Sequence, residues 1–293
     1  MFIGYIGRGG CLGGRSAAPQ HHGPERVLMP IIVTAPGGEL GRVVMRALRS
    51  EQAGDDTVLL NLMLQAPNTL LHDGHEWKRL QPAQIVARTK EFLSDPEHAG
   101  ADFIVHASYA FLRAADQGAK VGEKLQSIVE AARAAEDLVL ADSRPACVVR
   151  LGYLYGPESR NLKAYRTAFR LGRPYWAGPR KKLQYFLHTK DAARALLQAA
   201  RRRPTDRVVF ATDQRPVSFS TFMDHFARLI GNPVPLHIPR ISRTVAHLVV
   251  AEEHMEMVEL GIEGRATPVV PGFRPIYADF QTGLQHVVET WKR

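Results

Sequence analysis

The segment that most limits how this chain can fold is residues 29–50, MPIIVTAPGGELGRVVMRALRS. Its first part, residues 30–34, is apolar and has the length of a short buried strand. A glycine-containing turn follows. The residues after the turn carry an apolar stripe with the period of an amphipathic helix: Val43, Val44, Ala47 and Leu48. A strand that runs through a glycine turn into a helix is typical of α/β folds with parallel strands.

The alternation of strands and helices continues along the chain. Further apolar segments predict strands at 57–64, 75–80, 102–107, 146–151 and 207–213. Helical patterns lie between them, and the longest apolar stripe falls within 118–143. A later helix is expected to begin at Ser218 or Ser220 and to end at Gly231. This alternation predicts right-handed crossovers and a Rossmann-like, doubly wound parallel sheet.

Composition limits the kinds of partner and environment that we expect for this chain. The net charge is +9, but the charges are scattered, and the tight run at 201–203 is expected at a helix C-terminus, so we expect no nucleic-acid partner. Without a run of eighteen apolar residues, we expect no membrane span. The two cysteines, Cys11 and Cys147, imply no disulfide framework and fit a cytoplasmic protein, with Cys147 in a buried strand.

The N-terminal segment differs from the rest of the chain. Residues 1–28 are glycine-rich and end in a polar stretch, and their apolar part is too short for a secretory signal. We expect translation to start naturally at Met29. Residues 1–28 are then a disordered or non-native extension, and residues 29–293 form a single domain.

The glycine turn itself favours nucleotide binding. Gly37, Gly38 and Gly41 leave room for a pyrophosphate at the start of a helix, whose N–H groups and dipole attract anions. Ala35 stands where the first glycine of such a motif is expected. Glu39 places a negative charge nearby, which is unfavourable unless its side chain points away.

The residues that distinguish NAD from NADP lie further on. An acidic residue after the second strand would bind the ribose of NAD, but this region offers Asn61 and Gln65. Arg42 could meet a 2′-phosphate. We therefore expect NAD or NADP as cofactor, with a slight preference for NADP.

Several segments in order resemble the extended short-chain dehydrogenase/reductases, the nucleotide-sugar epimerase/dehydratase family. They are TAPGGELG, ADFIVHAS, VVRLGYLYGP, FLHTKDAARALLQA, PVSFSTF and GFRPIYADFQTGL, and together they span nearly all of 30–293. The resemblance implies a Rossmann-like core at about 29–215 and a smaller C-terminal substrate lobe from about 152–187 and 216–293, with a cleft between them. It implies a cofactor site made by Ala35, Gly37, Gly38, Leu40, Gly41, Arg42, Ala107 and Tyr153, and it is compatible with a homodimer.

The catalytic motif of the family is not found at its expected place. The family uses a Tyr-x-x-x-Lys pair in which the lysine lowers the pKa of the phenol. Counted back from VVRLGYLYGP, that pair falls near Ile128 and Ala132, neither of which transfers protons. The interval is also short, so we infer that a strand and the Tyr-Lys helix have been deleted or fused away.

Other residues are weaker candidates. Tyr109 with Arg113 repeats the spacing of the pair but is expected in a loop, where the alternative is an ordinary aromatic residue beside a solvated arginine. His188 could act as a general acid or could shape the start of a helix. Arg180, Lys181 and Lys182 could bind an anionic small molecule or could lie in a solvated loop. His72 and His75 are read as surface residues, and no metal site is expected.

Two functions follow from these features. The first is an NAD(P)-binding protein of the epimerase/dehydratase type with a degenerate catalytic site, which could still act as an oxidoreductase or epimerase on a nucleotide sugar or another carbonyl or hydroxyl substrate. The alternative is a non-catalytic NAD(P)-binding redox sensor or scaffold subunit. The sequence leaves open whether the chain is an enzyme.

Overall fold

A five-stranded parallel sheet forms the centre of the molecule in a computed structural model. The structure describes residues 31–34, 37–49, 57–62, 82–213, 215–238, 252–262 and 264–292. The strands are neighbours in the order β1 (Ile31–Val33), β2 (Val58–Asn61), β3 (Phe103–Tyr109), β4 (Ala146–Leu151) and β9 (Val208–Ala211). All four pairings are parallel, because each connection between consecutive strands contains a helix.

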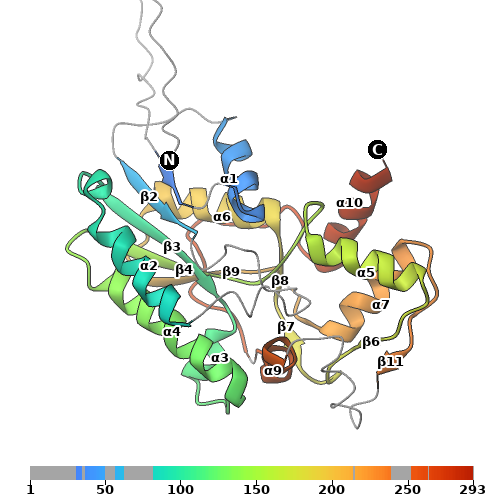
Figure 1. The fold of residues 1–293 in the computed structure, drawn as a ribbon. Coiled ribbons are helices and arrows are strands. Elements are labelled where there is room, and N and C mark those ends of the chain that lie inside the picture. The colour runs from blue at the N-terminus through green and yellow to red at the C-terminus, as the bar shows by residue number, and fades with distance from the viewer. Residues whose placement is uncertain are drawn as a thin grey trace, which may run out of the picture.

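Helices cover both faces of this sheet. Helices α1 (Glu39–Arg49) and α6 (Thr189–Arg202) pack together along one face, whereas α2 (Pro82–Ser94) and α4 (Glu123–Leu140) pack together along the other (Figure 1). The central strands are therefore almost continuously apolar and buried, as expected for a parallel sheet covered on both sides. The predicted Rossmann-like α/β class is confirmed.

The strand order brings equivalent strand ends together. All five strands are parallel, so their carboxyl ends lie at one edge of the sheet, and α1 and α2 lie on opposite faces. Open α/β sheets bind ligands outside the carboxyl ends of their strands. The right-handed crossovers stay a prediction, because the connection from β2 to β3 passes through 63–81, outside the described residues.

Most predicted elements are present, some with different bounds. The strand expected at 102–107 continues to Tyr109, and the long helix begins at Glu123, after the predicted start of its pattern. Ser218 is the residue that caps α7 (Phe219–Leu229): its Oγ accepts a hydrogen bond from the amide of Thr221 at 3.2 Å. The extension at 1–28 and the strand expected at 75–80 lie outside the described residues.

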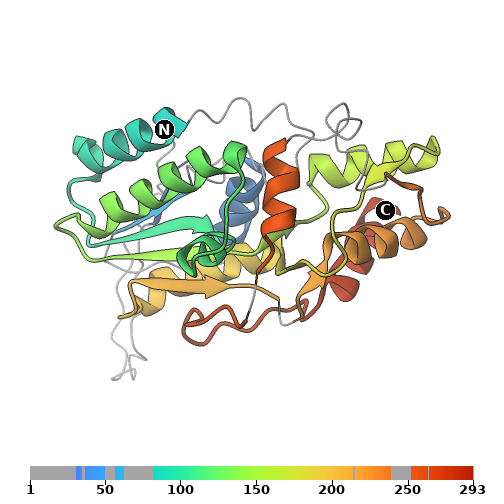
Figure 2. The ribbon, with the colours of Figure 1, turned by 90° about the horizontal axis from the view of Figure 1, so that it is seen from below.

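Shorter elements follow β4 and build the second half of the molecule (Figure 2). Its helices are α5 (Arg160–Arg170), α7 and α10 (Phe280–Lys292). Its strands form three small pairs: β5 (Tyr153–Tyr155) with β8 (Phe186–His188), β6 (Tyr175–Trp176) with β11 (His237–Ile238), and β7 (Leu183–Gln184) with β10 (Val217–Ser218). Aromatic rings fill the space between these elements, including Phe186 stacked on Phe222 with centroids 4.1 Å apart.

One helix lies between the two halves. Helix α9 (Glu252–Leu260) packs against α4 on one side and against the β5, β7 and α7 region on the other (Figure 2). Its residues His254, Met255, Met257 and Val258 are at most 1% exposed. A helix that is buried on opposite sides joins the halves into one core.

Candidate functional site

The glycine turn lies at the carboxyl edge of the sheet, between β1 and α1. Gly37 is exposed and Gly38 is half-buried, and α1 begins directly after them at Glu39. A Cβ placed on Gly37 would meet no atom within 4 Å, so the backbone there faces open space. The first amides of α1 have no partner within the helix and form its positive end. The turn thus has the room and the polarity that a phosphate needs.

The predicted cofactor residues of α1 take different positions. Leu40 and Gly41 are buried. Leu40 is 1% exposed and belongs to the main apolar core, so it anchors the start of α1 next to the turn. Arg42 is exposed, and its Nη1 donates a hydrogen bond to the carbonyl oxygen of Gly37. The guanidinium group therefore lies beside the turn. Ala35 is outside the described residues.

Glu39 points away from the turn. Its Oε1 accepts a hydrogen bond from the backbone amide of Arg160 at 3.0 Å, at the start of α5. Arg46 of the same helix forms an ion pair with Glu158. These contacts fix α1 to the segment that follows β5, and they direct the charge of Glu39 toward the positive end of α5.

The ends of β1 and β2 are joined by Asn61 and by Thr34, a residue that the sequence analysis did not single out. The hydroxyl of Thr34 donates to Oδ1 of Asn61 at 3.1 Å and accepts from the amide of Leu62 at 2.8 Å. Asn61 is fully buried. Thr34 directly follows an apolar strand, and that position was the signal by which it could have been found. Gln65 lies outside the described residues.

Ala107 and Tyr153, the remaining predicted cofactor residues, are buried. Ala107 is an interior residue of β3, and Tyr153 is the first residue of β5. The phenol oxygen of Tyr153 lies 3.4 Å from Nδ1 of His254 on α9. Burial raises the pKa of Tyr153 well above its ordinary value. Their contact with a cofactor stays a prediction.

The region where the family's catalytic pair is expected is part of the core. Ile128 and Ala132 lie in the middle of α4 with 3% and 0% exposure. Strand β3 pairs directly with β4, and α4 is the long helix between them. The assignment of the pair to these positions stays a prediction.

Tyr109 does not lie in a loop. It is the last residue of β3, is fully buried, and stacks on Phe111 with ring centroids 5.1 Å apart. Arg113 is half-buried; it donates to the carbonyl oxygen of Thr267 at 2.9 Å and lies 5.5 Å above the ring of Phe210. The loop expected at Tyr109 was wrong because β3 ends at Tyr109, two residues beyond the end of its predicted strand.

His188 is the N-cap of α6. Its Nδ1 accepts a hydrogen bond from the amide of Lys190 at 3.1 Å, and Nε2 is buried with no hydrogen-bond partner in the part of the chain that the structure describes. Burial, together with the charges of His286 and Lys190, lowers the pKa of His188 to about 3. The imidazole is therefore neutral near pH 7, which favours the helix-shaping role over general acid catalysis.

A buried ionic cluster lies beside the ends of β3 and β4. Arg150 donates to Glu136 through Nε at 2.9 Å and through Nη2 at 2.6 Å, and it also contacts Asp116. Ser108 donates to the same carboxylate of Glu136 at 2.5 Å. Arg150 and Glu136 are 7% and 4% exposed. The sequence pattern of α4 did not predict that these two charged side chains are buried. With every charge paired, the cluster fixes α4 on the sheet.

Helix α9 connects the first turn of α4 to the second half of the molecule. The carboxylate of Glu256 accepts a hydrogen bond from the amide of Leu125 at 2.8 Å, in the first turn of α4. On the opposite side, Nε2 of Gln184 donates to the carbonyl oxygen of Val258 at 3.2 Å. The two halves are thus in contact through α9 where the resemblance implies a cleft.

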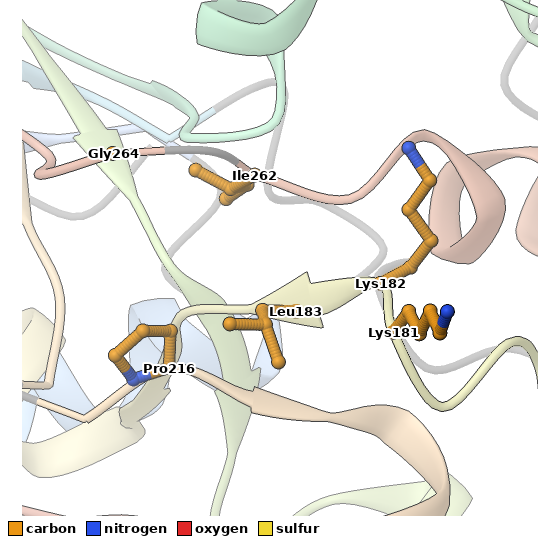
Figure 3. A pocket seen from close by; sticks show the side chains of 6 residues that line it. All are labelled: Lys181, Lys182, Leu183, Pro216, Ile262 and Gly264. Carbon is orange, nitrogen blue, oxygen red and sulfur yellow. The ribbon is translucent and has the colours of Figure 1, made fainter.

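A small pocket of about 250 Å³ lies near the end of α9 (Figure 3). Its lining includes Lys181, Lys182 and Ile262. The ammonium of Lys182 turns toward α9 and lies 3.5 Å from the carbonyl oxygen of Leu260, whereas that of Lys181 points away from the pocket. The predicted basic trio therefore does not converge on one point, and its anionic ligand stays a prediction.

Neither a metal site nor a membrane span was found in the described part of the chain. No group of three potential metal-binding side chains occurs there, and no helix is both long and apolar enough to cross a bilayer. His72 and His75 lie outside the described residues.

Comparison with known proteins supports the fold. The human epimerase family protein SDR39U1 (isoform 2) with NADPH has a TM-score of 0.64 and 14% identity over 89% of this chain and 99% of its own. RMD from Pseudomonas aeruginosa with NADPH has a TM-score of 0.64 and 13% identity over 91% and 99%. UDP-N-acetylglucosamine 4-epimerase from Bacillus cereus has a TM-score of 0.60 and 14% identity over 91% and 100%.

This chain has the fold of the extended short-chain dehydrogenase/reductases. The predicted resemblance is therefore confirmed at the level of the fold. A curated relative, the 3-diazoavenalumate denitrifying reductase of a Streptomyces species, is 30% identical over 113 residues. That match spans 38% of this chain and 37% of the relative. No protein-family model matches the chain.

Proposed function

We propose that this chain binds NAD(P) at the turn formed by Gly37 and Gly38. The observation that carries the proposal is the position of this turn: it follows a parallel strand, precedes the positive end of α1, and faces open space. Arg42 beside the turn supports a preference for NADPH, because a guanidinium binds phosphate with charge-assisted hydrogen bonds. Two of the solved structures with this fold contain NADPH.

The first experiment is a fluorescence titration of the full chain with NADH and NADPH. We expect micromolar binding of at least one nucleotide and its loss in Gly37→Asp and Gly38→Asp, because a carboxylate would occupy the place of the pyrophosphate. Gly100→Asp is the matched control: Gly100 is exposed, has open space, and precedes β3 at the other edge of the sheet. Failure of the unaltered chain to bind either nucleotide would contradict the proposal.

We infer further that bound nucleotide serves a non-catalytic role, as a redox sensor or scaffold subunit. Three observations support this inference. Ile128 and Ala132 are apolar and buried, His188 is held neutral, and α9 lies between the halves. A ligand present at a hundredfold excess over its Kd stabilises the folded state by about 2.7 kcal/mol, enough to couple nucleotide state to structure.

A reductase activity is the second candidate. The partial match to a reductase favours it, and so does the buried pair formed by Tyr153 and His254. The assay is NADPH oxidation, followed by absorbance, with a panel of aldehydes, ketones and nucleotide sugars. Turnover that is lost in Gly38→Asp would establish the enzyme and exclude the purely non-catalytic role. Absence of turnover under conditions of saturating NADPH is the result expected for a sensor.

A third part of the proposal concerns small anions. Lys181 and Lys182 line the pocket, and rotation of either flexible side chain would bring its ammonium group to an anionic group of a second ligand. Lys181→Gln is expected to weaken the binding of inorganic phosphate to the full chain.

A further inference from the structure

The positive charges, which look scattered along the chain as a whole, are unopposed by acidic residues in two segments. Residues 159–190 contain nine lysines and arginines and no acidic residue. Residues 225–251 contain three arginines and no acidic residue. The first segment forms α5 and β6, and the second continues from α7 into β11, which pairs with β6. Two segments free of acidic residues thus meet at one end of the second half of the molecule.

Helix α5 presents a basic stripe to solvent. Arg160, Lys163 and Arg170 are exposed and follow one another at intervals of three and seven residues, which places them on one face of the helix. Arg173 is exposed just beyond the helix. No carboxylate in the described residues forms an ion pair with Lys163, Arg170 or Arg173, although the structure forms such pairs elsewhere. Lys163, Arg170 and Arg173 are therefore available to an anionic partner.

Exposed aliphatic side chains lie at the end of this stripe. Leu171 is 63% exposed, Leu236 is 78% exposed and Val234 is 42% exposed. Hydrogen bonds join the segment at the end of α5 to the segment that precedes β11. The amide of Tyr175 donates to the carbonyl oxygen of Leu236 at 3.0 Å, and Nδ2 of Asn232 donates to the carbonyl oxygen of Phe169 at 3.1 Å. We call Leu171, Val234 and Leu236 the apolar tip.

We propose that the basic stripe of α5 and the apolar tip bind the surface of an anionic phospholipid membrane. Basic side chains meet lipid phosphates while exposed leucines enter the boundary between headgroups and acyl chains. The described chain has no helix suited to spanning a bilayer, so the contact is peripheral.

The kinds of side chain at this surface favour lipid over nucleic acid. Single-stranded nucleic acid is bound by stacking on exposed aromatic rings. Phe169 and Tyr175, whose backbones bind the segment of Asn232 and Leu236, are instead buried at 3% exposure each, and the exposed apolar groups of the tip are aliphatic. An aliphatic tip beside the exposed cations of Lys163, Arg170 and Arg173 matches a membrane interface.

The test is co-sedimentation of the full chain with vesicles of phosphatidylcholine alone or with 30 mol% phosphatidylglycerol. We expect binding to the anionic vesicles only, weakened by salt. The triple variant Lys163→Gln, Arg170→Gln, Arg173→Gln should bind about a hundredfold more weakly, because each basic residue contributes about 1 kcal/mol near such a surface. Leu171→Ser with Leu236→Ser should bind about tenfold more weakly at unchanged charge.

Matched variants make the test specific to this surface. Arg88→Gln, Lys90→Gln and Lys124→Gln remove the same charge from exposed positions of α2 and α4 and should leave vesicle binding unchanged. Ile276→Ser is the apolar control, since Ile276 is 61% exposed elsewhere. All variants should bind NADPH with the Kd of the unaltered chain. A loss of vesicle binding at unchanged NADPH affinity tests membrane binding separately from the nucleotide site. Equal binding to neutral vesicles, equal loss in the control variants, or binding of single-stranded RNA without vesicle binding would each overturn the proposal.

Discussion

The carboxylate of Glu39, in the first turn of α1, accepts a hydrogen bond from the amide of Arg160, in the first turn of α5, at 3.0 Å. One acidic side chain thus serves two helix N-termini that are 121 residues apart in the sequence. It compensates the dipole of its own helix and satisfies an amide that α5 leaves without a partner. The glycine turn and the second half of the molecule are connected at this point.

We expect Glu39→Ala to lower the free energy of unfolding by about 1–2 kcal/mol, the usual effect of losing a helix cap. Denaturant unfolding measures the change. Glu123→Ala is the control, because Glu123 occupies the same position in α4 but is exposed. Glu39→Gln should leave the Kd for NADPH within about twofold, since the carboxylate faces α5. A large gain in NADPH affinity would show instead that Glu39 repels the nucleotide.

Arg42 should decide between the two nucleotides. We expect Arg42→Gln to raise the Kd for NADPH about tenfold and to change that for NADH less than threefold, because only NADPH carries a 2′-phosphate. Parallel titrations measure both values. Arg88→Gln, an exposed arginine of α2, is the control. An equal loss for both nucleotides would assign Arg42 to the turn itself, through its hydrogen bond to Gly37.

Removing one partner of the buried pair formed by Glu136 and Arg150 should lower the free energy of unfolding more than replacing both partners by apolar residues. Glu136→Gln leaves Arg150 buried with incomplete compensation, and we expect a loss of about 3–5 kcal/mol in unfolding free energy. Glu136→Leu combined with Arg150→Met should lose less than the single variant. Arg133→Met provides the comparison, because the pair of Arg133 with Asp116 is partly exposed and worth about 1 kcal/mol or less. A double variant as unstable as the sum of the singles would contradict this account.

Acid should destabilise the protein through two buried histidines. Burial lowers the pKa of His106 to about 4, and burial with two neighbouring charges lowers that of His188 to about 3. The unfolded chain therefore binds more protons below about pH 6.5, and stability falls as pH decreases from there toward the folded-state pKa values. We expect about 2 kcal/mol to be lost per histidine between pH 7 and pH 5.

Denaturant unfolding at the two pH values measures this loss. His188→Asn should reduce it, because asparagine can still cap α6 but does not titrate. An NMR titration adds a direct check: the signal of His188 should stay unchanged above pH 5. A His188 pKa near 6.5 would reopen its role as a general acid.

Asp213 should destabilise the protein as pH rises, in contrast to the two histidines. Burial and the charge of Asp279 raise the pKa of Asp213 well above its ordinary value of 3.8. The folded state then binds the extra proton, and its destabilisation grows as pH rises from about 3.8 through the folded-state pKa. We expect Asp213→Asn to raise Tm by about 2–4 °C at pH 8 and by less than about 1 °C at pH 4. Asp137→Asn, at an exposed position of α4, should shift neither value. A lower Tm for Asp213→Asn at pH 8 would show that the charged form is needed.

The sequence alone was sufficient for the elements whose partners are local or generic. Val43, Val44, Ala47 and Leu48 form a stripe, and the stripe is the inner face of α1, because a helix needs only periodic apolar residues to be buried on one side. Cys147 lies in a buried strand as predicted, and burial raises the pKa of its thiol to about 12. The residues at 201–203 lie at the end of α6, also as predicted.

The tertiary structure alone decided which polar groups meet. Tyr109 belongs to β3 because Leu151 of β4 pairs with it, a contact 42 positions away along the chain that no local pattern reports. Glu39 faces α5, Glu256 faces α4, and Glu136 meets Arg150, although each looks in sequence like an ordinary surface residue of a helix. Apolar periodicity is set by burial along one segment, whereas a hydrogen bond or ion pair depends on the position and orientation of two segments. The spacing of residues therefore predicts burial along one segment, whereas polar contacts are determined only when two segments pack.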